Sequence, residues 1–206
     1  GLVELPLCLV NPGDVVLVPD PGYPDYWSGI ALARARMEML PLVAEQQFLP
    51  DYSAIPAAVA DRAKLMFLNY PNNPTGATAT KEFFAETVAF AAKYGIAIVH
   101  DFAYGAIGFD GKKPVSFLEV DGAKDVGVEI YTFSKTYNMA GWRVAFAVGN
   151  ERIIQALELL QDHLYVSLFG AVQEAAAAAL LSPQDCVTEL VALYEARRNA
   201  LIAALR

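Results

Sequence analysis

Lys135 is the side chain whose sequence setting most strongly suggests covalent chemistry. It follows an apolar run at residues 130–133, and Arg143 comes eight residues later. A lysine at the mouth of a buried strand, near a second cation, tends to lose its proton, and the neutral amine can form a Schiff base with a carbonyl group. The alternative is an ordinary solvated lysine. Thr132, Ser134 and Arg143 weigh against it, because two hydroxyl groups and a guanidinium in one loop suit a dianionic phosphate.

Three further polar residues follow other apolar runs. Asp101 ends such a run and should be partly buried, so we expect it to face a cation, for which a protonated pyridine nitrogen would serve; the alternative is a capping aspartate in a loop. Tyr104, three residues on, could donate to a phenolate oxygen or could be a packed aromatic residue. Asn73 lies in a loop stiffened by Pro71 and Pro74, so its amide should be held rigidly.

The elements that must position these residues are predicted from the alternation of short apolar runs with longer amphipathic ones. Strands are predicted at about residues 15–18, 37–43, 64–69, 96–101, 129–134 and 143–148. Helices are predicted at about residues 23–35, 52–60, 81–94, 151–164 and 171–181, and from residue 183 onward. This order predicts an α/β fold, a three-layer sandwich with a mostly parallel sheet and helices on both faces.

The last predicted strand should run antiparallel to the strand before it. The segment between them is too short for a parallel crossover, which needs a dozen or more residues. In open sheets of this kind, ligands bind at the carboxyl ends of the strands. We therefore expect one site at that edge, built from the polar residues of the segments 20–23, 69–76, 101–104 and 132–135.

Composition excludes several classes of protein. The 206 residues include 15 basic and 23 acidic side chains, a net charge of −8, which disfavours a nucleic-acid-binding surface. No apolar run approaches the ~20 residues that a membrane span needs. Two cysteines far apart in sequence, Cys8 and Cys186, fit a reducing compartment, so a cytoplasmic location is expected. His100 is expected to be a packed core histidine and His163 a helix-end residue, so no Ser/His/Asp triad can be assembled.

Three segments resemble the pyridoxal-phosphate-dependent class I/II aminotransferases of fold type I. They are Asn72-Asn73-Pro74-Thr75-Gly76, Asp101-Phe102-Ala103-Tyr104, and the run SKTYNMAGWR from Ser134 to Arg143. The resemblance extends along nearly the whole chain, and the lysine loop with its arginine is the most specific part. Thr132 stands where many relatives have serine, a difference that keeps the hydroxyl group.

The resemblance implies that eight residues bind pyridoxal 5'-phosphate. Lys135 would hold the cofactor as a Schiff base, Asp101 would pair with the pyridine nitrogen, and Tyr23 would stack on the ring. The ring hydroxyl would be bound by Asn73 and Tyr104, and the phosphate by Thr132, Ser134 and Arg143. Lys135, Asp101 and Tyr104 are accordingly the expected catalytic residues, no metal is expected, and the Asn73–Pro74 bond is expected to be cis.

The implied activity is transfer of an amino group from an amino acid to a 2-oxo acid by a homodimer. The alternatives are a pyridoxal-phosphate-dependent C–S β-lyase or a cofactor-binding regulatory domain of the same fold. The branch would lie near the LL-diaminopimelate, methionine and aromatic aminotransferases. Residue 1 is Gly and helical spacing continues to the last residue. Residues 1–206 are therefore expected to form the cofactor-binding large domain of a longer protein, without its N-terminal segment and C-terminal small domain.

Overall fold

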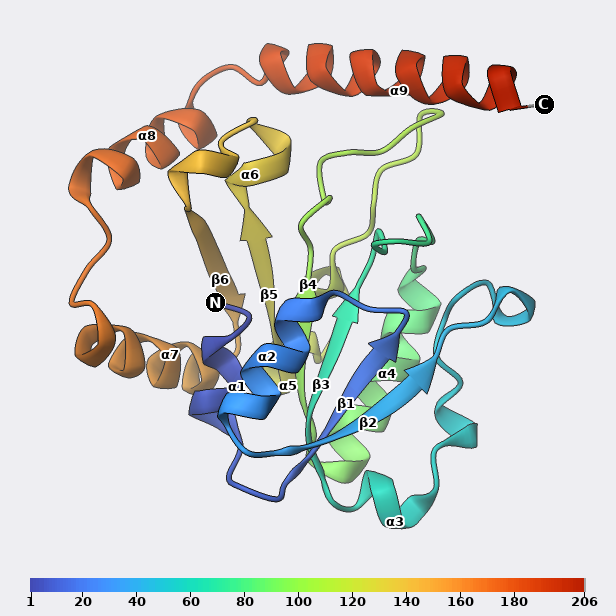
Figure 1. The fold of residues 1–206 in the computed structure, drawn as a ribbon, viewed down its shortest axis with the longest axis vertical. Helices are drawn as coiled ribbons and strands as arrows, with labels where there is room; N and C mark the ends of the chain where they lie inside the picture. The colour runs from blue at the N-terminus through green and yellow to red at the C-terminus, as the bar shows by residue number, and fades with distance from the viewer. Residues whose placement is uncertain (206) are drawn as a thin grey trace.

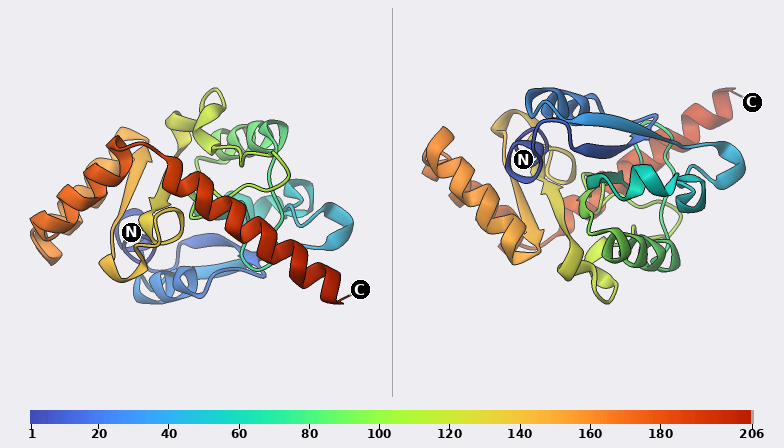
Figure 2. Two further views of the ribbon diagram at one scale, coloured as in Figure 1. Left: turned by 90° about the horizontal axis from the view of Figure 1, so that it is seen from above. Right: turned by 90° about the horizontal axis from the view of Figure 1, so that it is seen from below.

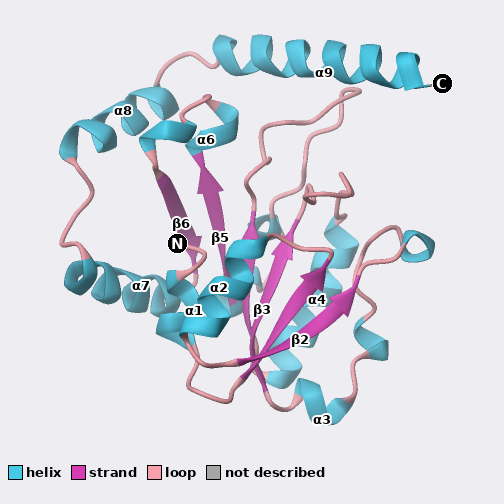
Figure 3. Cartoon of the chain, in the orientation of Figure 1, coloured by secondary structure: helices cyan, strands magenta, loops and turns pink. Residues whose placement is uncertain are grey.

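The structure is a computed structural model that describes residues 1–205. Its strands within this part are β1 (Val15–Asp20), β2 (Arg36–Pro41), β3 (Ala63–Asn69), β4 (Ala97–Asp101), β5 (Gly127–Thr132) and β6 (Ala145–Gly149). They form one sheet in the order β2-β1-β3-β4-β5-β6. All neighbouring pairs are parallel except β5 and β6, which are antiparallel. Figure 3 shows β5 and β6 pointing in opposite directions, as the short connection between them predicted.

Helices cover both faces of the sheet. The α-helices are α1 (Glu4–Leu9), α2 (Pro24–Leu32), α3 (Ala57–Ala60), α4 (Lys81–Tyr94), α5 (Ala123–Val126), α6 (Phe133–Thr136), α7 (Glu151–Leu164), α8 (Gly170–Leu181) and α9 (Asp185–Leu205). Short 3-10 turns are η1 (Ala44–Gln46), η2 (Tyr52–Ala54), η3 (Phe117–Glu119) and η4 (Ala140–Trp142). Figure 2 shows α2 and α4 on opposite sides of the sheet. The predicted three-layer α/β fold is confirmed.

The four central strands, β1, β3, β4 and β5, are largely buried because both faces of the sheet are packed there. On one face, Val16, Val18 and Val99 pack with side chains of α1, α2 and α7. On the other face, Leu17 and Ile98 pack with side chains of α4 and η3. Alternate residues of one strand therefore enter two different cores, as the two-residue repeat of a β-strand requires. We call these the α2 face and the α4 face.

Local signals set the ends of the best-predicted helices. In α4, the Thr80 hydroxyl accepts a hydrogen bond from the backbone N–H of Phe83 at 3.2 Å, and Gly95 closes the helix with φ of 68°. In α7, Asn150 accepts hydrogen bonds from the backbone N–H groups of Arg152 and Ile153. Both helices have the bounds predicted from the sequence.

Several predictions of local structure are wrong. The strand expected to reach residue 134 ends at Thr132, where α6 begins. The helix expected at residues 52–60 is divided into η2 and α3, because Pro56 begins the second piece and holds Ile55 in an extended conformation. The strand expected from Arg143 begins at Ala145 instead. Arg143 has a left-handed backbone with φ of 54°, which a continuous strand does not allow.

The last helix lies across the carboxyl ends of the strands (Figure 1). It contacts the loop between β4 and η3, where Arg198 forms a bidentate ion pair with Asp110, at 2.7 and 2.8 Å. No residue of α9 is buried. The prediction that helix continues to the end of the chain holds through Leu205, and Arg206 lies outside the described residues. No helix within residues 1–205 combines the length and apolarity needed to cross a membrane.

Candidate active site

The carboxyl ends of β3, β4 and β5 border a cavity of about 430 Å³. This volume is within the range of pockets that hold small molecules. The structure brings to its wall all eight residues to which the resemblance assigned a role. They are Tyr23, Asn73, Asp101, Tyr104, Thr132, Ser134, Lys135 and Arg143. Parallel strands end at the same edge of a sheet, so residues more than 100 positions apart in sequence meet there.

Asp101 is the buried charge of this cavity. It is 6% exposed, and the Tyr26 hydroxyl donates a hydrogen bond to its Oδ2 at 2.8 Å. Burial raises the pKa of the Asp101 carboxyl, and the hydrogen bond from Tyr26 opposes that rise. None of the ion pairs among the described residues includes Asp101. A buried carboxylate with one side-chain donor can still accept a hydrogen bond from a cation, and a protonated ring nitrogen fits that requirement.

Tyr26 reaches Asp101 because α2 places it over the sheet. Its side chain is fully buried, and its ring stacks on Phe67 of β3 with centroids 4.6 Å apart. Burial, followed by the negative charge of Asp101, raises the pKa of the Tyr26 phenol well above its usual value. The phenol therefore keeps its proton and stays a hydrogen-bond donor to Asp101.

Asn69 connects the ends of β3 and β4 to the loop that contains Asn73. Its Nδ2 donates to the main-chain oxygen of Asp101 at 2.8 Å, and its Oδ1 accepts from the backbone N–H of Asn73 at 2.8 Å. The loop closes at Gly76, whose N–H donates to the Asn72 carbonyl and whose φ is 73°. The Asn73–Pro74 bond is cis, as predicted, and so are the bonds before Pro21 and Pro71.

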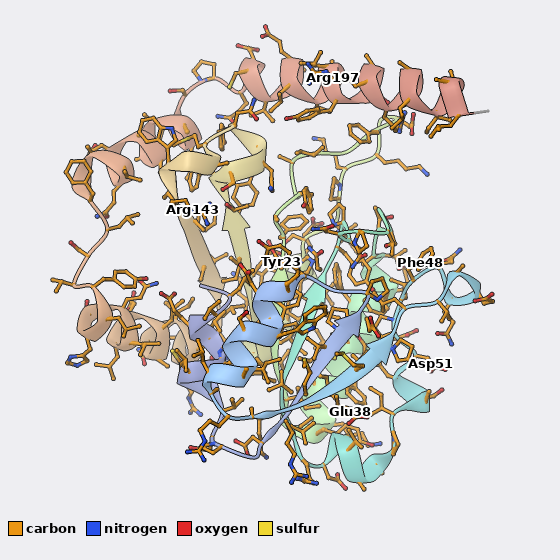
Figure 4. The ribbon with its side chains drawn as sticks, viewed as in Figure 1. Tyr23, Glu38, Phe48, Asp51, Arg143 and Arg197 are labelled. Carbon is orange, nitrogen blue, oxygen red and sulfur yellow. The ribbon has the colours of Figure 1, made fainter. Side chains whose placement is uncertain are left out.

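Thr132, Ser134 and Arg143 form the polar end of the cavity next to β5 and β6. The Thr132 hydroxyl accepts from the Ser134 backbone N–H at 3.2 Å and donates to the Ser134 hydroxyl at 3.0 Å. The Arg143 guanidinium donates one hydrogen bond, to the Ala140 carbonyl at 3.0 Å. Its other N–H groups bond to no acceptor among the described residues. Arg143 and Tyr23 are labelled in Figure 4, at the same end of the sheet. This end of the cavity can accept a group with several anionic oxygens.

Lys135 lies in α6, one residue beyond Ser134, and is exposed. Its amine forms no hydrogen bond or ion pair with any residue of the described range, so the amine is free to react with a bound group. Tyr104, which also lines the cavity, is half-buried. Burial, and then the charge of Asp101, raises the pKa of the Tyr104 phenol.

These groups fit pyridoxal phosphate in chemical type. The buried acid suits the ring nitrogen, the free amine suits the aldehyde carbon, and the two hydroxyl groups with the guanidinium suit the phosphate. Sequence reasoning assigned no role to Tyr26 or Asn69. Tyr26 lies three residues after Tyr23, which places both on one side of a helix start, and that spacing is the signal that could have indicated it.

His100 is a packed core histidine, as predicted. It is fully buried on the α4 face and pairs with Glu129, a residue that the sequence did not single out. His163 is exposed in the last turn of α7, also as predicted.

Comparison with known proteins gives one consistent result. The family model described as aminotransferase class I and II matches residues 1–206. The chain is 69% identical, over its whole length, to an L-glutamine–4-(methylsulfanyl)-2-oxobutanoate aminotransferase of Bacillus subtilis, and covers 52% of that relative. It is 55% identical over 205 residues to an LL-diaminopimelate aminotransferase of Desulforudis audaxviator, again covering 52% of it. The chain thus spans about half the length of the curated relatives it matches.

Solved structures agree with the sequence relatives. A substrate-bound structure of BacF from Bacillus subtilis superposes with a TM-score of 0.94 at 56% identity, over 96% of this chain and 50% of that one. An aminotransferase from Staphylococcus aureus superposes with a TM-score of 0.95 at 49% identity, over 100% of this chain and 54% of that one. The sheet order and the cavity described above therefore occur in a fold shared with these proteins.

Proposed function

Because this chain belongs to the aminotransferase class I and II family, which has fold type I and uses pyridoxal phosphate, we propose that it forms the cofactor-binding part of a transaminase. The enzyme would convert an amino acid and a 2-oxo acid into the corresponding 2-oxo acid and amino acid. The observation that carries the proposal is the cavity whose wall contains a free lysine amine, a buried carboxylate without a cation, and a cluster of phosphate-binding groups.

In the proposed site, each residue would have the role that the resemblance implies. Asp101 would bind the ring nitrogen and Tyr23 would pack on the ring. The side chains of Asn73 and Tyr104 would bind the ring hydroxyl, and those of Thr132, Ser134 and Arg143 would bind the phosphate. When bound, pyridoxal phosphate supplies an electrophilic aldehyde carbon and a ring that accepts an electron pair.

The side chains of the protein would then control proton transfer from the α-carbon of the amino acid. The Asp101 carboxylate would stabilise a positive charge on the ring nitrogen, and the hydrogen bond from Tyr26 holds that carboxylate in place. The Nζ of Lys135 would take the proton from the α-carbon of the amino acid as a general base. Lys135, Asp101 and Tyr104 are therefore the proposed catalytic residues.

The substrates are proposed from the relatives. The 69% identical relative is named for L-glutamine and 4-(methylsulfanyl)-2-oxobutanoate, so we propose these two as the first donor and acceptor to test. LL-diaminopimelate is the second donor to test, because several relatives at 47–55% identity are named for it.

The assembly and location are also proposals. Residues 1–206 would form the large domain of a longer protein, since the chain covers about half of its relatives. We propose a homodimer, which the apolar segment between α7 and α8 supports, because Val166 and Phe169 are 77% and 73% exposed. Sedimentation of the full-length protein tests it. The two free cysteines, Cys8 and Cys186, support a reducing, cytoplasmic location.

A half-reaction experiment on the full-length protein tests the activity. L-Glutamine alone should convert the cofactor's absorbance from its aldehyde to its amine form, and 4-(methylsulfanyl)-2-oxobutanoate should restore it. A lyase would instead release ammonia without needing a 2-oxo acid. Absence of any spectral change with the whole set of amino donors, in protein shown to bind the cofactor, would contradict the proposal.

A further inference from the structure

A buried histidine–glutamate pair lies behind the site, on the α4 face of the sheet. His100 is 0% exposed and Glu129, opposite it in β5, is 6% exposed. The His100 Nδ1 lies 3.0 Å from Glu129 Oε2, and its Nε2 lies 3.0 Å from the main-chain oxygen of Tyr70. Aromatic rings surround the imidazole, with Phe84 and Phe102 at centroid distances of 5.0 and 5.1 Å. Water is therefore excluded from both contacts.

The partners of this imidazole indicate its protonation state. The Tyr70 carbonyl can only accept a hydrogen bond, so Nε2 must donate. Glu129 also accepts from the Ser116 hydroxyl, at 2.9 and 3.0 Å, and from the Phe117 backbone N–H at 2.9 Å. Every neighbour of the Glu129 carboxyl can donate a hydrogen bond to it, so the carboxyl is best satisfied as an anion. The Nδ1 of His100 must then donate to Glu129 as well. An imidazole that donates from both nitrogens carries a positive charge.

This charge is close to the proposed cofactor site although it faces away from the cavity. His100 precedes Asp101 in β4, and the two side chains emerge on opposite faces. The positive charge of His100 lowers the pKa of Asp101, against the effect of burial, which is larger. The carbonyl bound by Nε2 belongs to Tyr70, three residues before Asn73. The loop that contains Asn73 is thus held by Asn69 and by His100 from the α4 face.

We propose that His100 is a positioning residue of this site: as an imidazolium held by Glu129, it fixes the Tyr70 carbonyl ahead of the Asn73 loop and places a positive charge next to Asp101 in β4. This inference rests on the proposed function in one respect only, the identity of the group that Asp101 binds. The competing explanation is a purely structural ion pair, which an uncharged, hydrogen-bonded pair could replace without any change at Asp101.

The first test reads the imidazole directly in the full-length protein without cofactor. Nitrogen-15 NMR at neutral pH, with the His100 ring signals assigned by through-bond correlation to the His100 backbone, should show two protonated ring nitrogens. One unprotonated nitrogen would overturn the proposal. This measurement needs no activity and no folded charge-removing variant, so it stands even if the proposed function fails.

The second test removes the charge and keeps the shape. In Glu129→Gln the imidazole can become neutral, donating from Nε2 to Tyr70 and accepting at Nδ1 from the new amide. The carboxyl carbon-13 titration of Asp101 in the cofactor-free protein should then move to higher pH, because a nearby positive charge is lost. The affinity for pyridoxal phosphate should fall about tenfold, the change produced by ~1.4 kcal/mol.

The matched control is Tyr52→Phe. It removes a partly buried hydrogen bond on the α4 face, between the Tyr52 hydroxyl and Thr87 at 2.7 Å, and leaves the histidine pair intact. It should lower stability without moving the Asp101 titration or the cofactor affinity. An unchanged Asp101 titration in folded Glu129→Gln, or the same shift in Tyr52→Phe, would overturn the proposal. Normal NMR results in a protein that does not bind pyridoxal phosphate would instead refute the proposed function alone.

Discussion

His100 and Asp101 are neighbours in β4, yet their side chains have different numbers of hydrogen-bond partners because they lie on opposite faces of the sheet. On the α4 face, His100 has a partner at both ring nitrogens, and Glu129 accepts hydrogen bonds from three residues. On the α2 face, Asp101 has one side-chain donor, Tyr26, and Lys135 has no partner within the described residues. Both faces contain buried charge, but only one has charge with unused hydrogen-bonding capacity.

This difference separates groups that hold the fold from groups available to a ligand. A buried polar group that lacks partners costs stability, so such groups are few in native proteins and often mark a place where a ligand binds. Completely paired groups such as His100 and Glu129 can stabilise the fold without a ligand. The comparison predicts that substitutions on the α2 face change activity, whereas those on the α4 face change stability first.

The largest expected effect is that of Lys135→Ala in the full-length enzyme. Turnover should fall by about 10³-fold or more, because general acid–base catalysis alone contributes ~10²–10⁴-fold and the covalent link to the cofactor is also lost. The cofactor should still bind through Asp101, Ser134 and Arg143. Steady-state kinetics and borohydride trapping measure the two effects. Lys124→Ala, on an exposed lysine of α5, is the control and should leave both unchanged. Trapping of the cofactor in Lys135→Ala would refute the assignment.

A large loss of stability is expected from Glu129→Leu. The substitution leaves the buried His100 without its counter-charge, and breaking a buried pair in this way costs about 3–5 kcal/mol. Urea unfolding of the cofactor-free protein measures it. Glu158→Leu, at an exposed position of α7, should change the free energy of unfolding by less than about 0.5 kcal/mol. Equal effects of the two substitutions would remove the basis of the comparison between the faces.

Asp101→Asn should lower activity and raise the stability of the cofactor-free protein. Turnover should fall about 100-fold, or ~2.7 kcal/mol, because the ring nitrogen loses its counter-charge. Burial raises the pKa of Asp101 in the folded state, so folding takes up a proton between the ordinary and the raised value, and stability falls as pH rises through that range. The variant should therefore be more stable than the wild type at neutral pH.

The pH dependence of that difference is its check. As pH falls to the ordinary range of an aspartate, both states of the wild type become protonated, and the advantage of Asp101→Asn should disappear. Thermal unfolding of both proteins across pH measures it. If the wild type were more stable than Asp101→Asn at neutral pH, Asp101 would have a stabilising partner in addition to Tyr26, and the contrast between the two faces would not hold.

Tyr26→Phe should lower turnover, as Asp101→Asn does, but by a smaller factor. It removes the hydrogen bond at 2.8 Å that lowers the Asp101 pKa, so that pKa should rise further. Turnover should fall about tenfold, since hydrogen bonds to charged groups contribute ~1.5–3 kcal/mol and part of the loss falls on stability. Carbon-13 titration and steady-state kinetics test it. A Tyr26→Phe enzyme with unchanged turnover would show that the ring nitrogen alone is enough to hold Asp101.

The smallest effect is expected at the second histidine. His163 is exposed in α7, so His163→Gln should change the free energy of unfolding by no more than about 0.5 kcal/mol. The same substitution at His100 removes both buried contacts and should be severely destabilising. Parallel urea unfolding curves compare them. Similar curves would show that burial of a histidine has no measurable consequence in this fold.

Local patterns in the sequence determined the order and type of most elements. Continuous apolar runs indicated strands covered on both faces, and the short connection before β6 required its antiparallel direction. The same patterns placed Asp101, Thr132 and Asn73 at or just after strand ends, and the resemblance to the class I and II aminotransferases implied the roles of all eight site residues. The prediction failed where a single residue overrides a periodic pattern, as Pro56 does between η2 and α3.

Tertiary structure alone decided which distant side chains form hydrogen bonds with each buried charged group. Tyr26 and Asp101 are 75 positions apart, and His100 and Glu129 are 29 apart. Their contacts depend on strand register and on how α2 packs over the sheet, which periods of two or four residues do not encode. The sequence by itself therefore determined that charged groups gather at the carboxyl edge of the sheet. The packing of its two faces decided that Asp101 keeps unused hydrogen-bonding capacity, whereas His100 does not.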